Sequence, residues 1–195
     1  MAKGPRYKIP QRRRKEGKTN YHKRKKLLIS KKNRLVIRAS NNNVNVQFVK
    51  SKLGGDIIIA SALSKELVKK FAWQLSTGNL PAAYLTGYMA GIKAIKNKIN
   101  NLVLDLGIAN HFHRQLAAFK GVLDAGLDIP HRESFFPEGF EKRIDGSHIQ
   151  DYAKKLAEKD EEKYKLRFSN YLKKIDPLKI TKIFSDTLNK IKNTA

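Results

Sequence analysis

The first 34 residues of the chain carry 15 lysines and arginines and a single acid, Glu16. Before Leu27, the only aliphatic side chain large enough to anchor a core is Ile9. A segment with so little apolar surface cannot offset the conformational entropy that it would lose on folding. We therefore expect residues 1–33, called the head below, to be disordered when the protein is free.

The charge of the head dominates that of the chain, which has 41 Lys and Arg against 17 Asp and Glu and a formal charge of +24. This excess indicates a polyanionic partner, either a nucleic acid or an anionic membrane surface. The head lacks the amphipathic face that a membrane-binding segment needs. Its cations alternate instead with Tyr7 and Tyr21, whose rings can stack on unpaired bases. The pattern favours RNA, with a merely solvated charge run as the alternative.

Several classes of protein are excluded by what the chain lacks. It contains no cysteine, which rules out disulfides, thiolate zinc sites and cysteine nucleophiles. Residues 1–6 lack the apolar stretch of a secretory signal. The uncharged segment 71–92 is interrupted by Gln74, Gly78 and Pro81, so it does not suit a bilayer. We expect a soluble, cytoplasmic protein with no membrane partner.

The folded part begins with strands. Residues 34–40 and 44–49 alternate in polarity around a run of asparagines, which predicts a β-hairpin. Two glycines then lead into a third strand over 56–62, and a fourth strand over 101–107 follows intervening helices. Three consecutive strands, followed by helices that alternate with a fourth strand, predict an α/β fold. We expect a small mixed sheet that is packed with helices, and its first strands should be antiparallel.

One of the intervening helices has a clear start and a distinctive strip. Asn79 is a good N-cap and Pro81 suits the first turn. Ala83, Gly87 and Gly91 follow at helical spacing and form a flat strip, which we expect to lie close on the sheet.

From residue 147 onward the pattern is helical, with narrow apolar faces and many charges. We expect these helices to dock either on the core domain or on a neighbouring macromolecule. The chain therefore divides into a basic extension (1–33), an α/β core domain (34–146) and a helical C-terminal extension (147–195).

Catalytic patterns are weak. His111, His113 and His131 could form a metal site, but His-x-His pairs are common by chance. Asp56 and Asp105 could hold magnesium in a nuclease, although turn and capping roles suit two such acids better. Nothing else indicates catalysis, a cofactor or a small-molecule substrate.

Five blocks of sequence resemble one family, the archaeal and eukaryotic form of large-subunit ribosomal protein eighteen, which binds 5S rRNA. The blocks are Lys18–Lys25, Asn33–Asn42, Ala82–Gly87, Lys120–His131 and Arg143–Ile149. The resemblance runs from about residue 5 to about residue 153, and the helical C-terminus points to the archaeal form. It implies a structural protein that attaches 5S rRNA to the large-subunit rRNA in the central protuberance, beside neighbouring large-subunit proteins.

The resemblance also implies which residues bind rRNA, in the head and in the first hairpin. By position they are Arg12, Arg13, Arg14, Lys18, Tyr21, Arg24, Lys25, Arg34, Arg38, Asn41 and Asn42. Because Arg34 and Arg38 are four apart on a strand, they point to one face. We expect this face to receive the RNA backbone while the other packs on helices. A general RNA- or DNA-binding protein, or a metal-dependent nuclease, remains an alternative.

Overall fold

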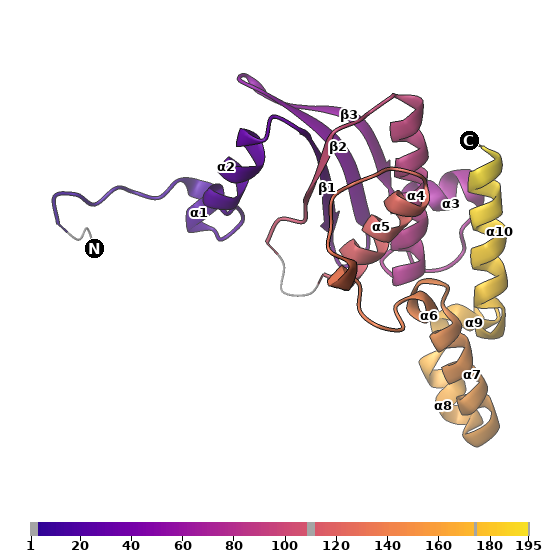
Figure 1. Ribbon diagram of the computed structural model, residues 1–195. Coiled ribbons are helices and arrows are strands. Elements are labelled where there is room, and N and C mark those ends of the chain that lie inside the picture. Colours follow the sequence, from indigo (N-terminus) through magenta and orange to yellow (C-terminus); the bar gives the residue numbers. More distant parts are fainter. Residues whose placement is uncertain (1–3, 109–111, 174, 195) are drawn as a thin grey trace.

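The computed structural model describes residues 4–108, 112–173 and 175–194 (Figure 1). Its elements are α1 (Arg12–Lys15), α2 (Tyr21–Ile29), β1 (Asn33–Ala39), β2 (Val44–Lys52), β3 (Gly55–Leu63), α3 (Ser64–Phe71), α4 (Leu80–Lys96), β4 (Leu102–Asp105), α5 (His113–Asp124), η1 (Glu133–Phe135), α6 (Glu141–Ile144), α7 (Ser147–Lys159), α8 (Glu161–Arg167), α9 (Ser169–Leu172), η2 (Pro177–Lys179) and α10 (Ile180–Asn193).

Four strands form one mixed sheet in the order β3-β2-β1-β4. β1 pairs antiparallel with β2, and β2 pairs antiparallel with β3, as the alternating pattern predicted. β4 pairs with β1 in parallel, with Arg34 opposite Val103 and Val36 opposite Asp105. A helical crossover is what joins parallel strands, and here the chain passes through α3 and α4 before it reaches β4. The predicted α/β class with a mixed sheet is confirmed.

The two faces of the sheet have different neighbours. On the inner face, Leu35, Ile37, Val46 and Phe48 are fully buried in the core. Helices α4 and α5 cover this face, whereas α1 and α2 of the head lie on the other side of the sheet (Figure 1). The alternation of β1 thereby leaves its second set of side chains on the outer face, toward the head.

Helix α4 begins as its sequence predicted, with Asn79 as N-cap accepting a hydrogen bond from the Ala82 amide at 2.9 Å. The prediction that its strip of small residues lies against the sheet was wrong. A Cβ on Gly87 would overlap the backbone of Ala118 in α5, and one on Gly121 would overlap the backbone of Tyr84 in α4. The glycines therefore bring two helices together, rather than one helix onto the sheet, because both helices share the inner face.

The C-terminal extension returns to the core. Ile180, Phe184 and Ile191 of α10 are buried in the same apolar cluster as the sheet and α4. The rings of Phe184 and Tyr84 are 5.7 Å apart between centroids. Of the two docking partners expected for these helices, α10 uses the core domain, while α7 and α8 project from the body (Figure 1).

The head contains two short helices that the sequence analysis did not expect. Neither has a buried residue, in agreement with the lack of a core-forming stripe. The start of α2 is set by Asn20, whose side chain accepts a hydrogen bond from the Lys23 amide at 3.0 Å. Within the described residues, no helix has the length and apolar character that crossing a membrane requires.

The close approach of α4 and α5 gives a test of the fold. Gly87→Ala should lower the free energy of unfolding by about 1–3 kcal/mol, because the added methyl forces the helix backbones apart. In an unconstrained helix the same change would stabilise by about 1 kcal/mol. Urea unfolding of the full chain measures the difference. Gly54→Ala is the control, since its Cβ meets nothing within 4 Å, and it should change stability by less than about 0.5 kcal/mol.

Candidate nucleic-acid interface

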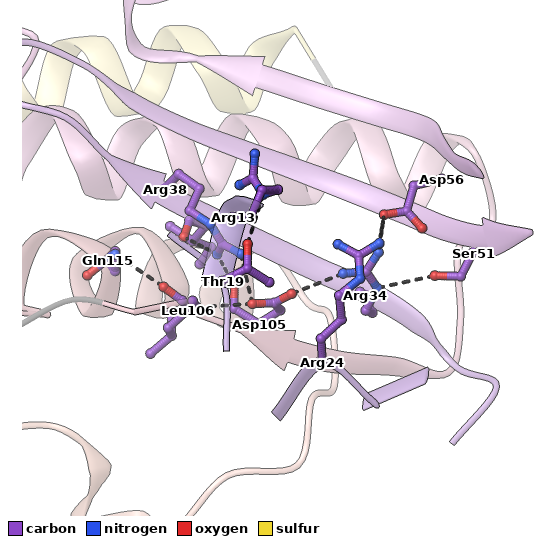
Figure 2. Close-up of polar contacts among 12 residues, drawn as sticks. Arg13, Thr19, Arg24, Arg34, Arg38, Ser51, Asp56, Asp105, Leu106 and Gln115 are labelled. Carbon is purple, nitrogen blue, oxygen red and sulfur yellow. Dashed lines mark hydrogen bonds and ion pairs between the residues drawn. The ribbon is translucent and has the colours of Figure 1, made fainter. Parts of the chain in front are cut away.

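The outer face of the sheet is linked to the head by a chain of ion pairs (Figure 2). Arg34 lies at its centre: Nη1 donates to Asp105 at 3.0 Å, Nη2 donates to Asp56 at 2.6 Å, and Nε donates to Ser51 at 3.3 Å. Arg24 of α2 donates to the same Asp56 oxygen at 2.9 Å. The pairs join β1 to β4, to the β2–β3 hairpin and to the head.

Arg34 is buried between the sheet and the head. Its side chain is only 3% exposed, and each of its three guanidinium nitrogens donates within the protein. A group placed in this way cannot turn toward a phosphate without breaking these bonds and leaving the buried Asp105 with Arg38 as its remaining arginine partner. The structure therefore gives Arg34 a positioning role within the protein, and the direct RNA contact expected of it stays a prediction.

Arg38 points to the same face, as the strand spacing predicted, but it is 46% exposed. Nη1 donates to the Asp105 carbonyl at 2.6 Å and to the Ile37 carbonyl at 2.9 Å, and Nη2 donates to Asp105 Oδ1 at 2.9 Å. These bonds fix the guanidinium plane while they leave part of it open to solvent. Arg38 is thus an oriented cation on the surface.

Asp56 is the acid that holds the head to the sheet. Partial burial alone would raise its pKa, but the hydrogen bond from Arg34 and the charges of Arg34 and Arg24 hold the pKa below its usual value of 3.8. Asp56 is therefore a carboxylate at neutral pH, and the contact between α2 and the hairpin is an ion pair.

The basic side chains of the head surround two hollows. One is a cavity of about 90 Å³ between the head and the sheet, called the head cavity below, and Arg38 and Lys23 both border it. The other is an open groove of about 890 Å³ between residues 7–11 and α2, called the head groove. Tyr7, Tyr21 and His22 line this groove, so aromatic rings and cations share one surface.

The remaining residues predicted from the head are exposed on this surface. Arg12 pairs with Glu16 at 2.9 Å and so does Lys18, which lies between α1 and α2. Arg13 donates to Thr19 at 2.9 Å. The last two residues of the predicted set, Arg14 of α1 and Lys25 of α2, line the head groove.

Asn41 and Asn42 lie elsewhere, in the turn between β1 and β2. Their backbone carbonyls accept hydrogen bonds, from Arg114 at 3.2 Å and from Thr77 at 2.6 Å respectively. The turn is thereby fastened to α5 and to the loop before α4. The structure does not bring these two asparagines together with the head, so the predicted site is divided between two separate parts of the surface.

Sequence reasoning missed two kinds of residue at this interface. Lys23 and Asn20 were in the head but were not singled out, because nothing in the sequence showed which face of α2 meets the sheet. Asp56 and Asp105 were considered as metal ligands or capping residues, and their role as partners of arginines was not predicted. That role depends on the parallel pairing of β4 with β1, which no local pattern encodes.

The metal alternative finds no support in these side chains. Asp56 and Asp105 have oxygens committed to guanidinium groups, which leaves no carboxylate pair for a divalent ion. No group of three His, Cys, Asp or Glu suitable for a metal occurs among the described residues. His131 packs edge-on against Phe119, and His111 lies outside the described residues.

Comparison with known proteins decides the family. The family model described as "Ribosomal large subunit proteins 60S L5, and 50S L18" matches residues 5–105. Three relatives are each named "Large ribosomal subunit protein uL18". The protein from Aeropyrum pernix is 45% identical over 88% of this chain and 80% of its own. The one from Saccharolobus solfataricus is 44% identical over 100% and 98%, and the one from Thermofilum pendens is 45% identical over 98% and 97%.

The chain belongs to this family. The resemblance inferred from the five sequence blocks is confirmed, and so is its archaeal character, since all three relatives come from archaea. A large-subunit ribosomal protein is a structural component and not an enzyme, which removes the nuclease alternative. The family model covers residues 5–33 of the head and all four strands, the part of the chain that carries the ion pairs of Arg24, Arg34 and Arg38.

The buried position of Arg34 gives a second test. Arg34→Met should lower the free energy of unfolding by about 3–5 kcal/mol, because it breaks a buried ion pair and leaves Asp105 with only the half-exposed Arg38 as its partner. Arg24→Met removes the same charge from an exposed pair, so it should cost only about 0–1 kcal/mol. Urea unfolding of the two variants makes the comparison. If both variants were destabilised equally little, the positioning role of Arg34 would be wrong.

Proposed function

We propose that this chain binds 5S rRNA and attaches it to the large-subunit rRNA in the central protuberance of the cytoplasmic ribosome, beside neighbouring large-subunit proteins. Membership of the large-subunit family supports a ribosomal role. The observation that carries the RNA contact is the exposed surface of the head, which holds 14 of the chain's 41 Lys and Arg within residues 1–33.

The geometry of the head suits RNA for two reasons. The arginines of α1 lie on a short helix with no buried residue, so their guanidinium groups are exposed and can reach phosphates. The aromatic side chains of the head face an open groove together with lysines, an arrangement that accepts unpaired bases by stacking. Duplex DNA offers no unpaired bases to such a groove.

The head has few interactions of its own to hold it in place. Arg24 to Asp56 is its ion pair with the sheet, and both partners are partly exposed. We expect the head to gain order on binding, when phosphates neutralise its charge. The rest of the molecule supplies a rigid platform, since α4 and α5 pack behind the sheet and α10 packs on α4.

The arginines of α1 provide the first test of this function. Replacement of Arg12, Arg13 and Arg14 by Ala should weaken binding to 5S rRNA and reduce the salt slope by roughly 0.7–0.9 for each phosphate that the protein no longer neutralises. Fluorescence anisotropy at several salt concentrations, with excess tRNA and duplex DNA as competitors, measures both quantities.

The matched control removes three charges from the projecting helix α7. Replacement of Lys154, Lys155 and Lys159, which are exposed, should leave the salt slope unchanged. Equal weakening in the two triple variants would show that binding follows net charge alone. Equal affinity of the wild-type chain for all three nucleic acids would reject the 5S assignment and leave a general nucleic-acid-binding protein.

Tyr21, the first residue of α2, tests the stacking contact. Tyr21→Ala should weaken 5S rRNA binding by about 1–3 kcal/mol, the usual contribution of one stacked base. Tyr21→Phe keeps the ring and serves as the control, so it should bind like the wild-type chain. An Ala variant with unchanged affinity would show that this ring does not stack.

A further inference from the structure

The head cavity gathers positive charge from three parts of the chain. It is bordered by Arg13 and Lys18 around the end of α1, by Lys23 and Arg24 of α2, and by Arg38 of β1. Cations held around one small space repel each other, and the repulsion is strongest where water is partly excluded. Such a grouping is stable only if anions balance it.

The protein itself balances only part of this charge. Lys18 and Arg24 each pair with an acid outside the cavity. The single carboxylate that borders the cavity is Asp105, which already pairs with two arginines. Within the described part of the chain, Lys23 and Arg13 have no carboxylate partner. The cavity therefore lacks one negative charge or more.

The arginine on the sheet side of the cavity has donors to spare. Two nitrogens of Arg38, Nη1 and Nη2, hold Asp105 and the Ile37 carbonyl. No hydrogen bond among the described residues uses its Nε. A guanidinium carries five N–H donors, so the Nε–Nη2 edge still offers two that lie parallel. That edge matches two oxygens of a carboxylate or a phosphate.

Gly107 keeps this guanidinium in place. Its backbone amide donates to Asp105 Oδ1 at 3.0 Å, and its φ of +72° suits glycine. A Cβ at this position would lie 2.8 Å from Arg38 Cζ. The backbone therefore packs directly on the arginine, and a larger residue would displace it. The loop after β4 is shaped around an oriented Arg38.

We propose that the head cavity binds one phosphate group, with the free edge of Arg38 forming a fork to two oxygens and Lys23 adding a point charge. The volume of about 90 Å³ exceeds the about 10–15 Å³ that one water needs, and a tetrahedral phosphate has room in it. This inference deepens the proposed function, because the phosphate is then one of the RNA backbone. A phosphate bound there joins the head to the sheet.

The test with RNA uses full-length protein and 5S rRNA that carries one ethylated, hence neutral, phosphate per molecule. One position should exist whose ethylation weakens wild-type binding by about tenfold, the effect of a charge-assisted hydrogen bond. Lys23→Ala should remove this sensitivity, because the interaction is already missing. Lys26→Ala, which removes the same charge from the same helix away from the cavity, should retain it.

A second measurement separates phosphate chemistry from RNA binding. The side-chain Nε–Hε NMR signal of Arg38 should shift to saturation with inorganic phosphate but not with chloride at equal ionic strength. Lys23→Ala should raise the midpoint by about tenfold, and Lys26→Ala should match the wild-type chain. Arg38→Lys, which keeps the charge but removes the fork, should reproduce the RNA defect of Lys23→Ala.

The outcomes separate the two proposals. If Lys23→Ala loses the sensitivity to ethylation and Lys26→Ala retains it, an RNA phosphate in the head cavity is supported. Saturation by inorganic phosphate with no coupled RNA position supports a site for free phosphate and rejects the RNA source. If neither effect is observed while 5S rRNA binding is intact, the cavity site is rejected and the proposed function stands. Absence of 5S rRNA binding rejects the proposed function, and the phosphate titration still decides the cavity.

Discussion

The outer face of this molecule depends on one buried arginine. Arg34 bonds to Asp105 on one side and to Asp56 on the other, so β1 is tied to the parallel strand β4 and to the β2–β3 hairpin. The same two acids hold Arg38 and Arg24, which are partly exposed. Removing charges from water is costly, and close ion pairs and hydrogen bonds must offset that cost. Here all three guanidinium nitrogens of Arg34 donate to partners within the protein, and the same two acids orient two surface cations.

The charge distribution explains why the head needs this platform. A segment with almost no apolar side chains cannot fold around its own core, and its cations repel one another. The structure attaches it to the sheet through the Arg24 to Asp56 pair and leaves its other cations on the surface. In the proposed function, binding of a polyanion supplies the charge balance that the chain lacks. A phosphate in the head cavity would then add a second link between the head and the sheet.

The inner face of the sheet is apolar, and its packing against helices keeps the sheet rigid. Gly87 and Gly121 let α4 and α5 approach until their backbones touch, and both helices then cover the same face of the sheet. Helix α10 closes the far side of α4 with Phe184 against Tyr84. Because all of this packing lies behind the sheet, the outer face is free for charged side chains.

The sequence by itself determined the local features of this protein. Alternation placed Arg34 and Arg38 on one face, Asn79 and Pro81 began α4, and the polar head excluded a core. Its blocks of sequence were specific enough to identify the family. Each of these properties depends on residues close together in the chain, where spacing alone decides which side chains share a face.

Only the tertiary structure decided how distant segments meet. The pairing of β4 with β1 set Asp105 beside Arg34 across a separation of 71 residues, which buried that arginine in an ion pair that no local pattern predicts. The strip at Gly87 turned out to face α5 and not the sheet, and α10 docked on the core. Several strand pairings can satisfy the local sequence pattern equally well, and the packing of the whole chain selects one of them. For that reason the oriented Arg38 and the cavity beside it emerged from the fold and not from any motif.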